Sequence, residues 1–195
     1  IKQENFFGSG NYLGIDVNTS KYRRTLVFST TNPYFTQDGI SRTVDLYYRT
    51  DKPYEDQGGN YELVTTGASM RFGIPFSETD TVFFGGGFEQ TQIKAGTNIP
   101  ATYLAYANTY GATSNSIPLT VGWSRDDRDS ALAPNSGRYQ RLNSEWSVAG
   151  DARYVRGNYQ YQQYIPLNKR FTVAFNGEAG YGKGLNGRPF PVFKN

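Results

Sequence analysis

Apolar and polar side chains alternate along most of this chain with a period of two residues. In residues 117–124, for example, every second position is apolar or aromatic and most positions between them are small or polar. Successive side chains of a β-strand point to opposite faces, so this pattern predicts strands with one apolar face. The same alternation recurs in residues 13–18, 43–49, 64–74, 82–91, 142–148, 155–165 and 171–181.

Two further segments and the connections complete the pattern. Residues 24–35 also predict a strand, although consecutive apolar residues blur its alternation, and residues 1–7 resemble the end of another. Turn-forming Gly, Pro, Asn and Asp residues separate the segments. The long break is 95–116, where tyrosines at spacings of three and four predict one short helix over residues 101–110. We therefore expect an all-β, antiparallel fold of about ten strands joined by hairpins.

The composition of the two predicted faces favours a transmembrane barrel over a soluble sandwich. The polar face is rich in Gly, Ser, Thr, Asn and Gln with few charges of either sign, as in a wet lumen, and aromatic residues gather at strand ends. We expect these residues to face lipid: Val82, Phe84, Phe88, Leu119, Val121, Trp123, Val173 and Phe175. We expect these residues to face the lumen: Arg71, Glu89, Asp126, Glu145, Arg156 and Glu178.

Composition excludes several classes of function. The chain has 195 residues, a net charge of +3, no Cys and no His, which removes thiol catalysis and every nucleophile–histidine pair. Basic residues form no run, so we expect no nucleic-acid partner, and nothing predicts a metal or another cofactor. The longest stretch without polar side chains is residues 82–88. A membrane-spanning helix needs about 20 apolar residues, so this stretch is too short for one.

Several residues are typical of turns rather than of chemistry. Pro33 cannot donate to a strand ladder, Gly39 follows Asp38 in a tight turn, and Pro134 and Gly137 mark another connection. The carboxylates of residues 126, 127 and 129 suggest a metal site or paired acids. Because arginines lie among them, we interpret them instead as neutralised, solvated turn charges.

Three stretches, in order, resemble the barrel of the BamA family, the outer-membrane protein assembly factors of Gram-negative bacteria within the bacterial surface antigen superfamily. The first is residues 3–10, followed by Thr31-Asn32-Pro33-Tyr34-Phe35 and Asp38-Gly39. The second is residues 122–129, continuing through Pro134 and Gly137. The third is residues 180–182 with the closing segment 189–195. The resemblance covers essentially the whole chain and corresponds to the second to eleventh strands of a sixteen-stranded barrel.

This resemblance implies a function without covalent chemistry. The chain, residues 1–195, is expected to be part of a barrel that folds and inserts other β-barrel proteins in the outer membrane. Partners implied are unfolded outer-membrane proteins, outer-membrane lipid and lipopolysaccharide, and accessory lipoproteins bound through periplasmic POTRA domains. Those domains would precede Ile1, and a sixth extracellular loop and the last strands would follow Asn195. We therefore expect the chain alone neither to close into a native barrel nor to assemble other proteins.

Three other classes remain open from the sequence. One is a related outer-membrane secretion pore or a TamA-like translocation factor. The second is an outer-membrane phospholipase or protease, which the lack of His disfavours. The third is a soluble, carbohydrate-binding sandwich, which shares the alternating pattern.

Overall fold

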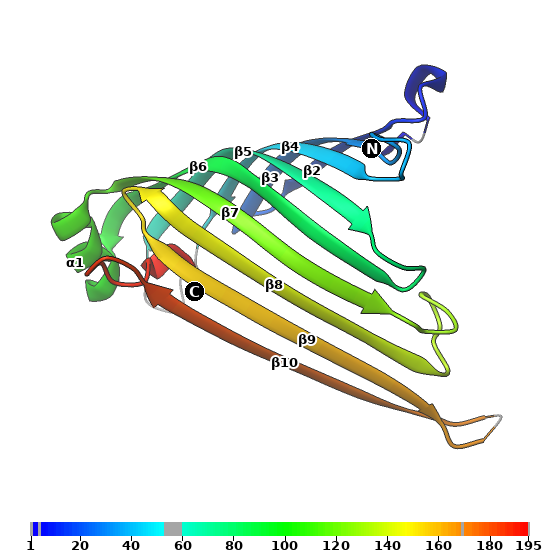
Figure 1. The fold of residues 1–195 in the computed structure, drawn as a ribbon. Coiled ribbons are helices and arrows are strands. Elements are labelled where there is room, and N and C mark those ends of the chain that lie inside the picture. Colours follow the sequence, from blue (N-terminus) through cyan, green and yellow to red (C-terminus); the bar gives the residue numbers. More distant parts are fainter. Residues whose placement is uncertain (1, 4, 53–59, 169, 195) are drawn as a thin grey trace.

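The computed structural model describes residues 2–3, 5–52, 60–168 and 170–194, and it places ten antiparallel strands in one sheet in chain order. Figure 1 shows this continuous meander. The expected all-β fold of about ten strands is confirmed. The elements are β1 (Lys2–Gln3), η1 (Phe6–Gly8), β2 (Tyr12–Thr19), β3 (Arg23–Asn32), β4 (Ser41–Asp51), β5 (Asn60–Pro75), β6 (Asp80–Asn98), α1 (Ala101–Tyr110), β7 (Thr113–Asp126), β8 (Gly137–Gly150), β9 (Tyr154–Pro166), β10 (Thr172–Gly184) and η3 (Val192–Lys194).

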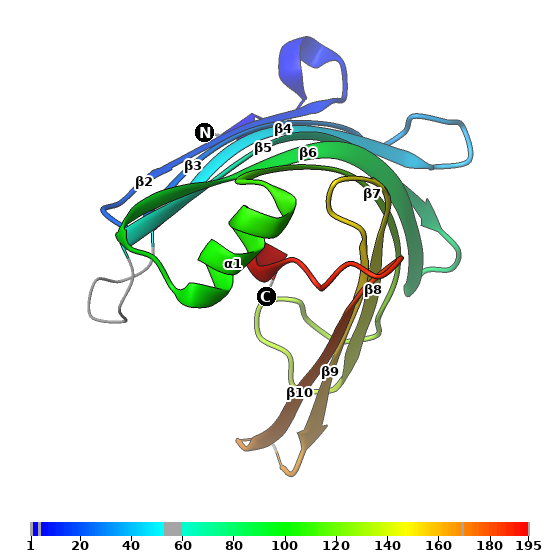
Figure 2. The ribbon, with the colours of Figure 1, turned by 90° about the vertical axis from the view of Figure 1, so that its left-hand side faces the viewer.

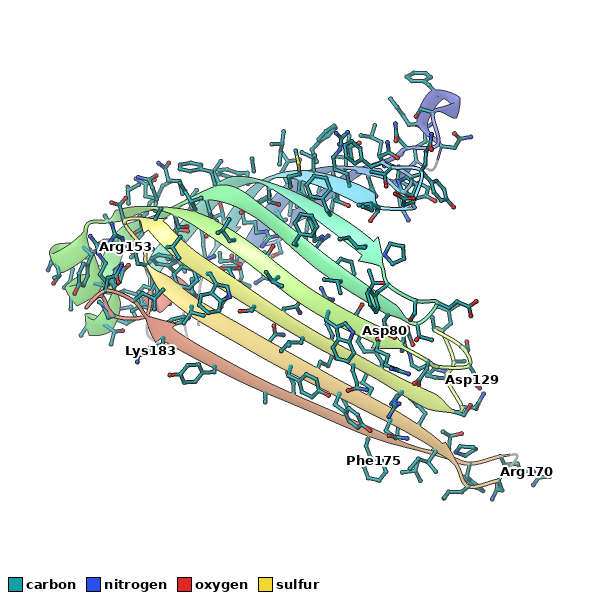
Figure 3. All side chains as sticks on the ribbon, viewed as in Figure 1. Asp80, Asp129, Arg153, Arg170, Phe175 and Lys183 are labelled. Carbon is teal, nitrogen blue, oxygen red and sulfur yellow. The ribbon has the colours of Figure 1, made fainter. Side chains whose placement is uncertain are left out.

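The sheet curls around α1 and the C-terminal residues, so it has a concave and a convex face (Figure 2). Its two edges are β1, which pairs only with β2, and β10, which pairs only with β9. We call the end that carries α1 and the connection 151–153 the α1 end. The opposite end carries the connections 76–79, 127–136 and 167–171, and we call it the turn end. Figure 3 shows Asp80 and Asp129 at the turn end, and Arg153 and Lys183 at the α1 end.

Two boundaries differ from the sequence prediction. The break expected over residues 95–116 is shorter, because β6 continues to Asn98 and β7 begins at Thr113. The backbone N–H of Ile93 bonds to the carbonyl of Ala112 at 2.7 Å, which extends the pairing beside the helix. Of residues 1–7, expected to be the end of a strand, the described part forms β1 at Lys2–Gln3, and η1 begins at Phe6.

Glycines let β5 and β6 approach closely in the middle of the sheet. A Cβ on Gly85 would lie 2.4 Å from the carbonyl oxygen of Met70, and one on Gly87 would lie 2.4 Å from that of Ala68. Contacts this short are sterically forbidden for any larger residue unless the backbone shifts. The Gly85-Gly86-Gly87 run is therefore a packing feature of the sheet.

The most buried apolar side chains gather beneath α1 at the α1 end. Ile93 of β6 is 4% exposed, Tyr106 of α1 is 6% exposed, and Tyr154 of β9 is fully buried. Along the convex face, by contrast, large aliphatic and aromatic side chains remain about half exposed. The protein therefore has a small core inside the curve of the sheet and a wide apolar surface outside it.

Candidate functional site: a polar cluster on the concave face

The eight residues expected to face lipid share the convex face. The register pairs Phe84 with Val121 and Val82 with Trp123, and Leu119 lies two residues from Val121 on the same side of β7. Phe88 lies on that side of β6, and Figure 3 shows Phe175 of β10 pointing away from the sheet. The face of the sheet follows from the register, and contact with lipid stays a prediction.

The six residues expected to face the lumen share the concave face, but the structure brings only three of them together. Glu89, Glu145 and Arg156 meet around one side chain of the C-terminal residues. Arg71 and Glu178 are exposed and make no ion pair within the described part of the chain. Asp126 lies at the turn end, where both of its carboxylate oxygens accept hydrogen bonds from Arg128, at 2.8 and 2.7 Å.

Lys194 lies at the centre of this cluster. Its Nζ is 2.7 Å from Glu89 Oε1 and 3.4 Å from Glu145 Oε1. The Lys194 side chain is 10% exposed, and the two carboxylates are 11% and 17% exposed. Arg156 donates from Nη2 to Glu145 Oε2 at 3.0 Å and from Nη1 to the Lys194 carbonyl at 3.4 Å. Two carboxylates and two cations thus neutralise one another in a partly dry environment.

Two tyrosines complete the cluster. The hydroxyl of Tyr47 donates to Glu89 Oε2 at 3.1 Å, and that of Tyr154 donates to Glu145 Oε1. Tyr154 also packs its ring edge-on against Phe190. The six side chains, which we call the lumen cluster, are Tyr47, Glu89, Glu145, Tyr154, Arg156 and Lys194.

Helix α1 holds the same C-terminal residues from the other side. Tyr103 donates from its hydroxyl to the Val192 carbonyl at 3.1 Å, and Tyr106 packs edge-on against Phe193. Burial and a hydrogen bond with Tyr61 raise the pKa of Tyr103 to about 12, so its hydroxyl stays protonated and able to donate at neutral pH. Residues 185–194, here called the C-terminal segment, therefore lie between α1 and the concave face, as Figure 2 shows.

Sequence reasoning missed half of this cluster. It placed Glu89, Glu145 and Arg156 on the polar face but did not single out Tyr47, Tyr154 or Lys194. Tyr47 stands beside Tyr48 in an aromatic pair whose members lie on opposite faces of β4, and only the alternation separates them. Lys194 lies outside any strand, so no period marks it as a concave-face residue.

The acidic residues at the turn end are paired within their own connection. Asp127 accepts a hydrogen bond from Arg138 at 3.1 Å, and Asp129 accepts from the backbone N–H groups of Asn135 and Ser136. Those two N–H donors hold the pKa of Asp129 below its usual range. In the residues that the structure describes, no group of three acidic side chains is arranged to hold a metal ion.

The residues expected in turns lie at or beside strand boundaries. β3 ends at Asn32, immediately before Pro33, and Gly39 has a φ of +80° in the next connection. Pro134 lies in the connection 127–136. Gly137 is the first residue of β8, with a φ of +94°, and a Cβ there would lie 2.3 Å from the carbonyl oxygen of Asp127.

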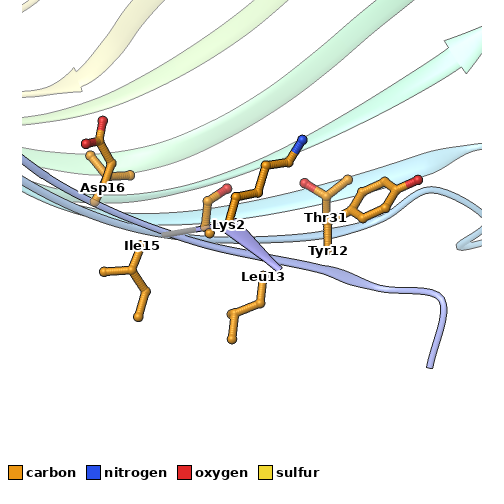
Figure 4. A pocket seen from close by; sticks show the side chains of 9 residues that line it. Lys2, Tyr12, Leu13, Ile15, Asp16 and Thr31 are labelled. Carbon is orange, nitrogen blue, oxygen red and sulfur yellow. The ribbon is translucent and has the colours of Figure 1, made fainter. Parts of the chain in front are cut away.

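A separate hollow of about 460 Å³ lies beside the β1 edge. Figure 4 shows Leu13 and Ile15 pointing to one side of the sheet while Asp16 and Thr31 point to the other. The hollow therefore runs along the short β1 edge on both faces of the sheet. Its polar side chains do not point toward one common centre. The lumen cluster is the better-formed site, because its six side chains engage one another and the C-terminal segment. Such an arrangement is suited to fixing a chain segment in place.

No helix in the described residues is both long enough and apolar enough to cross a membrane. Comparison with protein families matches residues 5–195 to the Omp85 superfamily domain. The chain belongs to the Omp85 superfamily. Among curated relatives it is 30% identical over 207 residues to an outer membrane protein assembly factor BamA of Neisseria meningitidis, covering 100% of this chain and 26% of that protein.

Two further comparisons agree with this assignment. The chain is 25% identical to a BamA of Nitratidesulfovibrio vulgaris over 86% of its length, covering 20% of that protein. The fold is similar to a crystal structure of BamA from Haemophilus ducreyi lacking POTRA domains 1–3, with a TM-score of 0.89 and 23% identity, over 99% of this chain and 39% of that one. The chain thus spans about a quarter of its Neisseria relative. It is part of an integral outer-membrane β-barrel of the Gram-negative type.

Proposed function

We propose that this chain forms the wall of an outer-membrane protein assembly factor, a barrel that folds and inserts other β-barrel proteins into the Gram-negative outer membrane. The observation that carries the proposal is the similarity over the whole chain to a BamA assembly factor, together with a sheet of the same fold. The curated relatives described above carry the same assembly-factor name, which favours this function over a secretion pore or a TamA-like factor.

The physical basis of such a function is strand addition. Unpaired backbone N–H and C=O groups cost several kcal/mol each in hydrocarbon, so an exposed sheet edge in a membrane recruits another strand. A client strand that pairs with such an edge forms its backbone hydrogen bonds there, before it separates from the barrel wall. No covalent chemistry is needed, and the lumen cluster contributes by fixing the C-terminal segment against the concave face.

The two faces take different surroundings in this proposal. The convex apolar residues, among them Phe84, Val121 and Phe175, contact lipid, and the concave polar residues line a wet lumen. The α1 end faces the cell exterior, so the connection that contains α1 lies outside the hydrocarbon. Partners are unfolded outer-membrane proteins, outer-membrane lipid and lipopolysaccharide, and accessory lipoproteins that bind through POTRA domains of the full-length protein.

The test is insertion of a client by the full-length protein. Purified full-length protein in phospholipid vesicles is mixed with a urea-unfolded outer-membrane protein, and insertion is followed by protease protection. We expect faster insertion than into empty vesicles. Equal rates with and without the protein would contradict the proposal. Vesicles that instead transport a soluble polypeptide, without accelerating client insertion, would favour the secretion-pore alternative.

Sidedness has its own test. On intact cells that carry the full-length protein, an added protease is expected to cleave within the α1 connection, residues 99–112. Protection on intact cells, with cleavage only after the outer membrane is permeabilised, would reverse the proposed orientation and leave the assembly function standing.

A further inference from the structure

The convex face over β3–β6 is not evenly filled. One row of residues across these strands runs Phe28, Leu46, Ala68 and Phe88, and the register places them opposite one another. Ala68 is much smaller than its neighbours. A groove of about 500 Å³ results, lined on its apolar side by Leu26, Phe28, Leu46, Tyr48, Ala68 and Phe88. The large side chains that form its walls (Leu26, Phe28, Leu46, Tyr48 and Phe88) are 40–51% exposed, so the groove is open to the surroundings of the convex face.

Basic residues lie beyond this groove toward the α1 end, on the same face. Arg24 is two residues from Leu26 along β3, which is about 7 Å, and Lys94 is four residues from Gln90 along β6, which is about 14 Å. Lys52 and Lys94 flank a single carboxylate, Glu62, at 3.4 and 3.9 Å. Within the described residues Arg24 makes no ion pair. Among the residues that the structure describes, this patch therefore holds three cations and one carboxylate.

An apolar groove beside a surplus of positive charge matches an amphiphile with an acyl chain and an anionic headgroup. An acyl chain in the groove gains van der Waals contacts with its walls, and the cations attract the phosphate of the headgroup. The distances of 7–14 Å fit a headgroup at the end of the strands and a chain that runs toward the middle of the sheet.

We propose that this surface binds one phosphorylated glycolipid of the outer leaflet, with an acyl chain in the groove and a phosphate near Arg24, Lys52 and Lys94. The choice of a glycolipid rests on the proposed orientation, because the basic residues lie at the α1 end and the outer leaflet of a Gram-negative outer membrane is built of lipopolysaccharide. The proposal does not rest on the assembly activity.

The test titrates full-length protein in detergent with bis-phosphorylated lipid A and counts bound lipid by native mass spectrometry. We expect one tightly bound lipid, and binding about tenfold weaker for the dephosphorylated form. Arg24→Gln combined with Lys94→Gln should weaken binding about tenfold to thirtyfold. Ala68→Phe should also weaken binding, because it fills the groove. Two controls should bind as the unmodified protein does: Arg141→Gln on the concave face and Val121→Phe on the convex face away from the groove.

Three outcomes would overturn the proposal. The first is equal binding of lipid A by all variants. The second is equal binding of the phosphorylated and dephosphorylated lipids. The third is equally tight binding of phosphatidylglycerol that the same substitutions weaken, which would identify a phospholipid as the occupant. The charge variants keep the test decisive if Ala68→Phe fails to fold. Client insertion by the same preparations separates the proposals, since loss of insertion with intact lipid binding counts only against the assembly function.

Discussion

The convex and concave faces of one sheet behave as two different kinds of surface. On the convex face Val121 and Phe175 are 54% and 57% exposed, and their partners across the strands are Phe84 and Ser144 for Val121 and Gln163 for Phe175. On the concave face Lys194 is 10% exposed and touches groups from two strands far apart in the chain. The convex face is therefore specified strand by strand, whereas the concave face is specified by contacts between distant segments.

The largest expected effect comes from placing a charge on the convex face. Val121→Lys should lower the free energy of unfolding by about 2–4 kcal/mol if Val121 lies near the middle of the hydrocarbon. Thr120→Lys, one residue away on the concave face, should cost much less. Urea unfolding of the full-length protein in lipid vesicles, followed by gel mobility, measures both. Equal losses for the two lysines would remove the distinction between the faces.

Glu89 is a poor choice for a neutral concave-face control. A residue that merely faces a wet lumen would tolerate Glu89→Gln, and the alternating pattern by itself predicts that tolerance. In the structure the Glu89 side chain is 11% exposed and binds Lys194 and Tyr47, so the substitution breaks a nearly buried network. Asn158→Ala, on the same face, remains a suitable control.

A smaller effect is expected where β5 and β6 approach. Gly85→Ala should destabilise the protein by about 1–3 kcal/mol, because the new Cβ meets the backbone of Met70. Gly177→Ala is the matched control, since nothing lies within 4 Å of its Cβ position. The same urea titration compares them. A Gly85→Ala protein as stable as the control would show that the two strands separate easily.

Removing the lysine of the lumen cluster tests the concave face. Lys194→Met should destabilise the docked C-terminal segment by about 1–2 kcal/mol, because it leaves Glu89 and Glu145 without their shared cation. Limited proteolysis of the full-length protein should then cut residues 185–194 faster, while the exposed Lys183→Met control is unchanged. A double-mutant cycle with Glu145→Gln should give a coupling energy, and additive effects would contradict the pairing.

The smallest effect concerns pH at the turn end. The lowered pKa of Asp129 means that its carboxylate stabilises the connection 127–136 at pH values above the ordinary aspartate range. That stabilisation is lost as pH falls through the lowered pKa. Amide hydrogen exchange at residues 135–137 should therefore become faster, relative to the rest of the sheet, as the pH falls. Asp129→Asn should remove this pH dependence, and an unchanged pH dependence in that variant would assign it to another group.

How much the sequence could predict depends on how far apart along the chain the interacting residues lie. Alternation within a strand is local, so the sequence could predict the ten strands, the convex residues and helix α1. The faces of Leu26, Val27 and Phe28 become clear only from the pairing of β3 with β4. The lumen cluster joins Tyr47 to Glu89 and Glu89 to Lys194 across long stretches of chain. No period connects such residues, so only the folded sheet shows that they meet.

The most direct test of the two-faced sheet is a nitroxide scan along β7. This chain has no cysteine, so single cysteines at positions 117–125 of the full-length protein, with any other cysteine removed, can be labelled in lipid vesicles. Collision with oxygen should peak at positions 117, 119, 121 and 123, and collision with a water-soluble nickel complex should peak at positions 120 and 124, the concave-face positions that are not buried. Uniform accessibility along β7, or the opposite alternation, would contradict the assignment of the convex face to lipid.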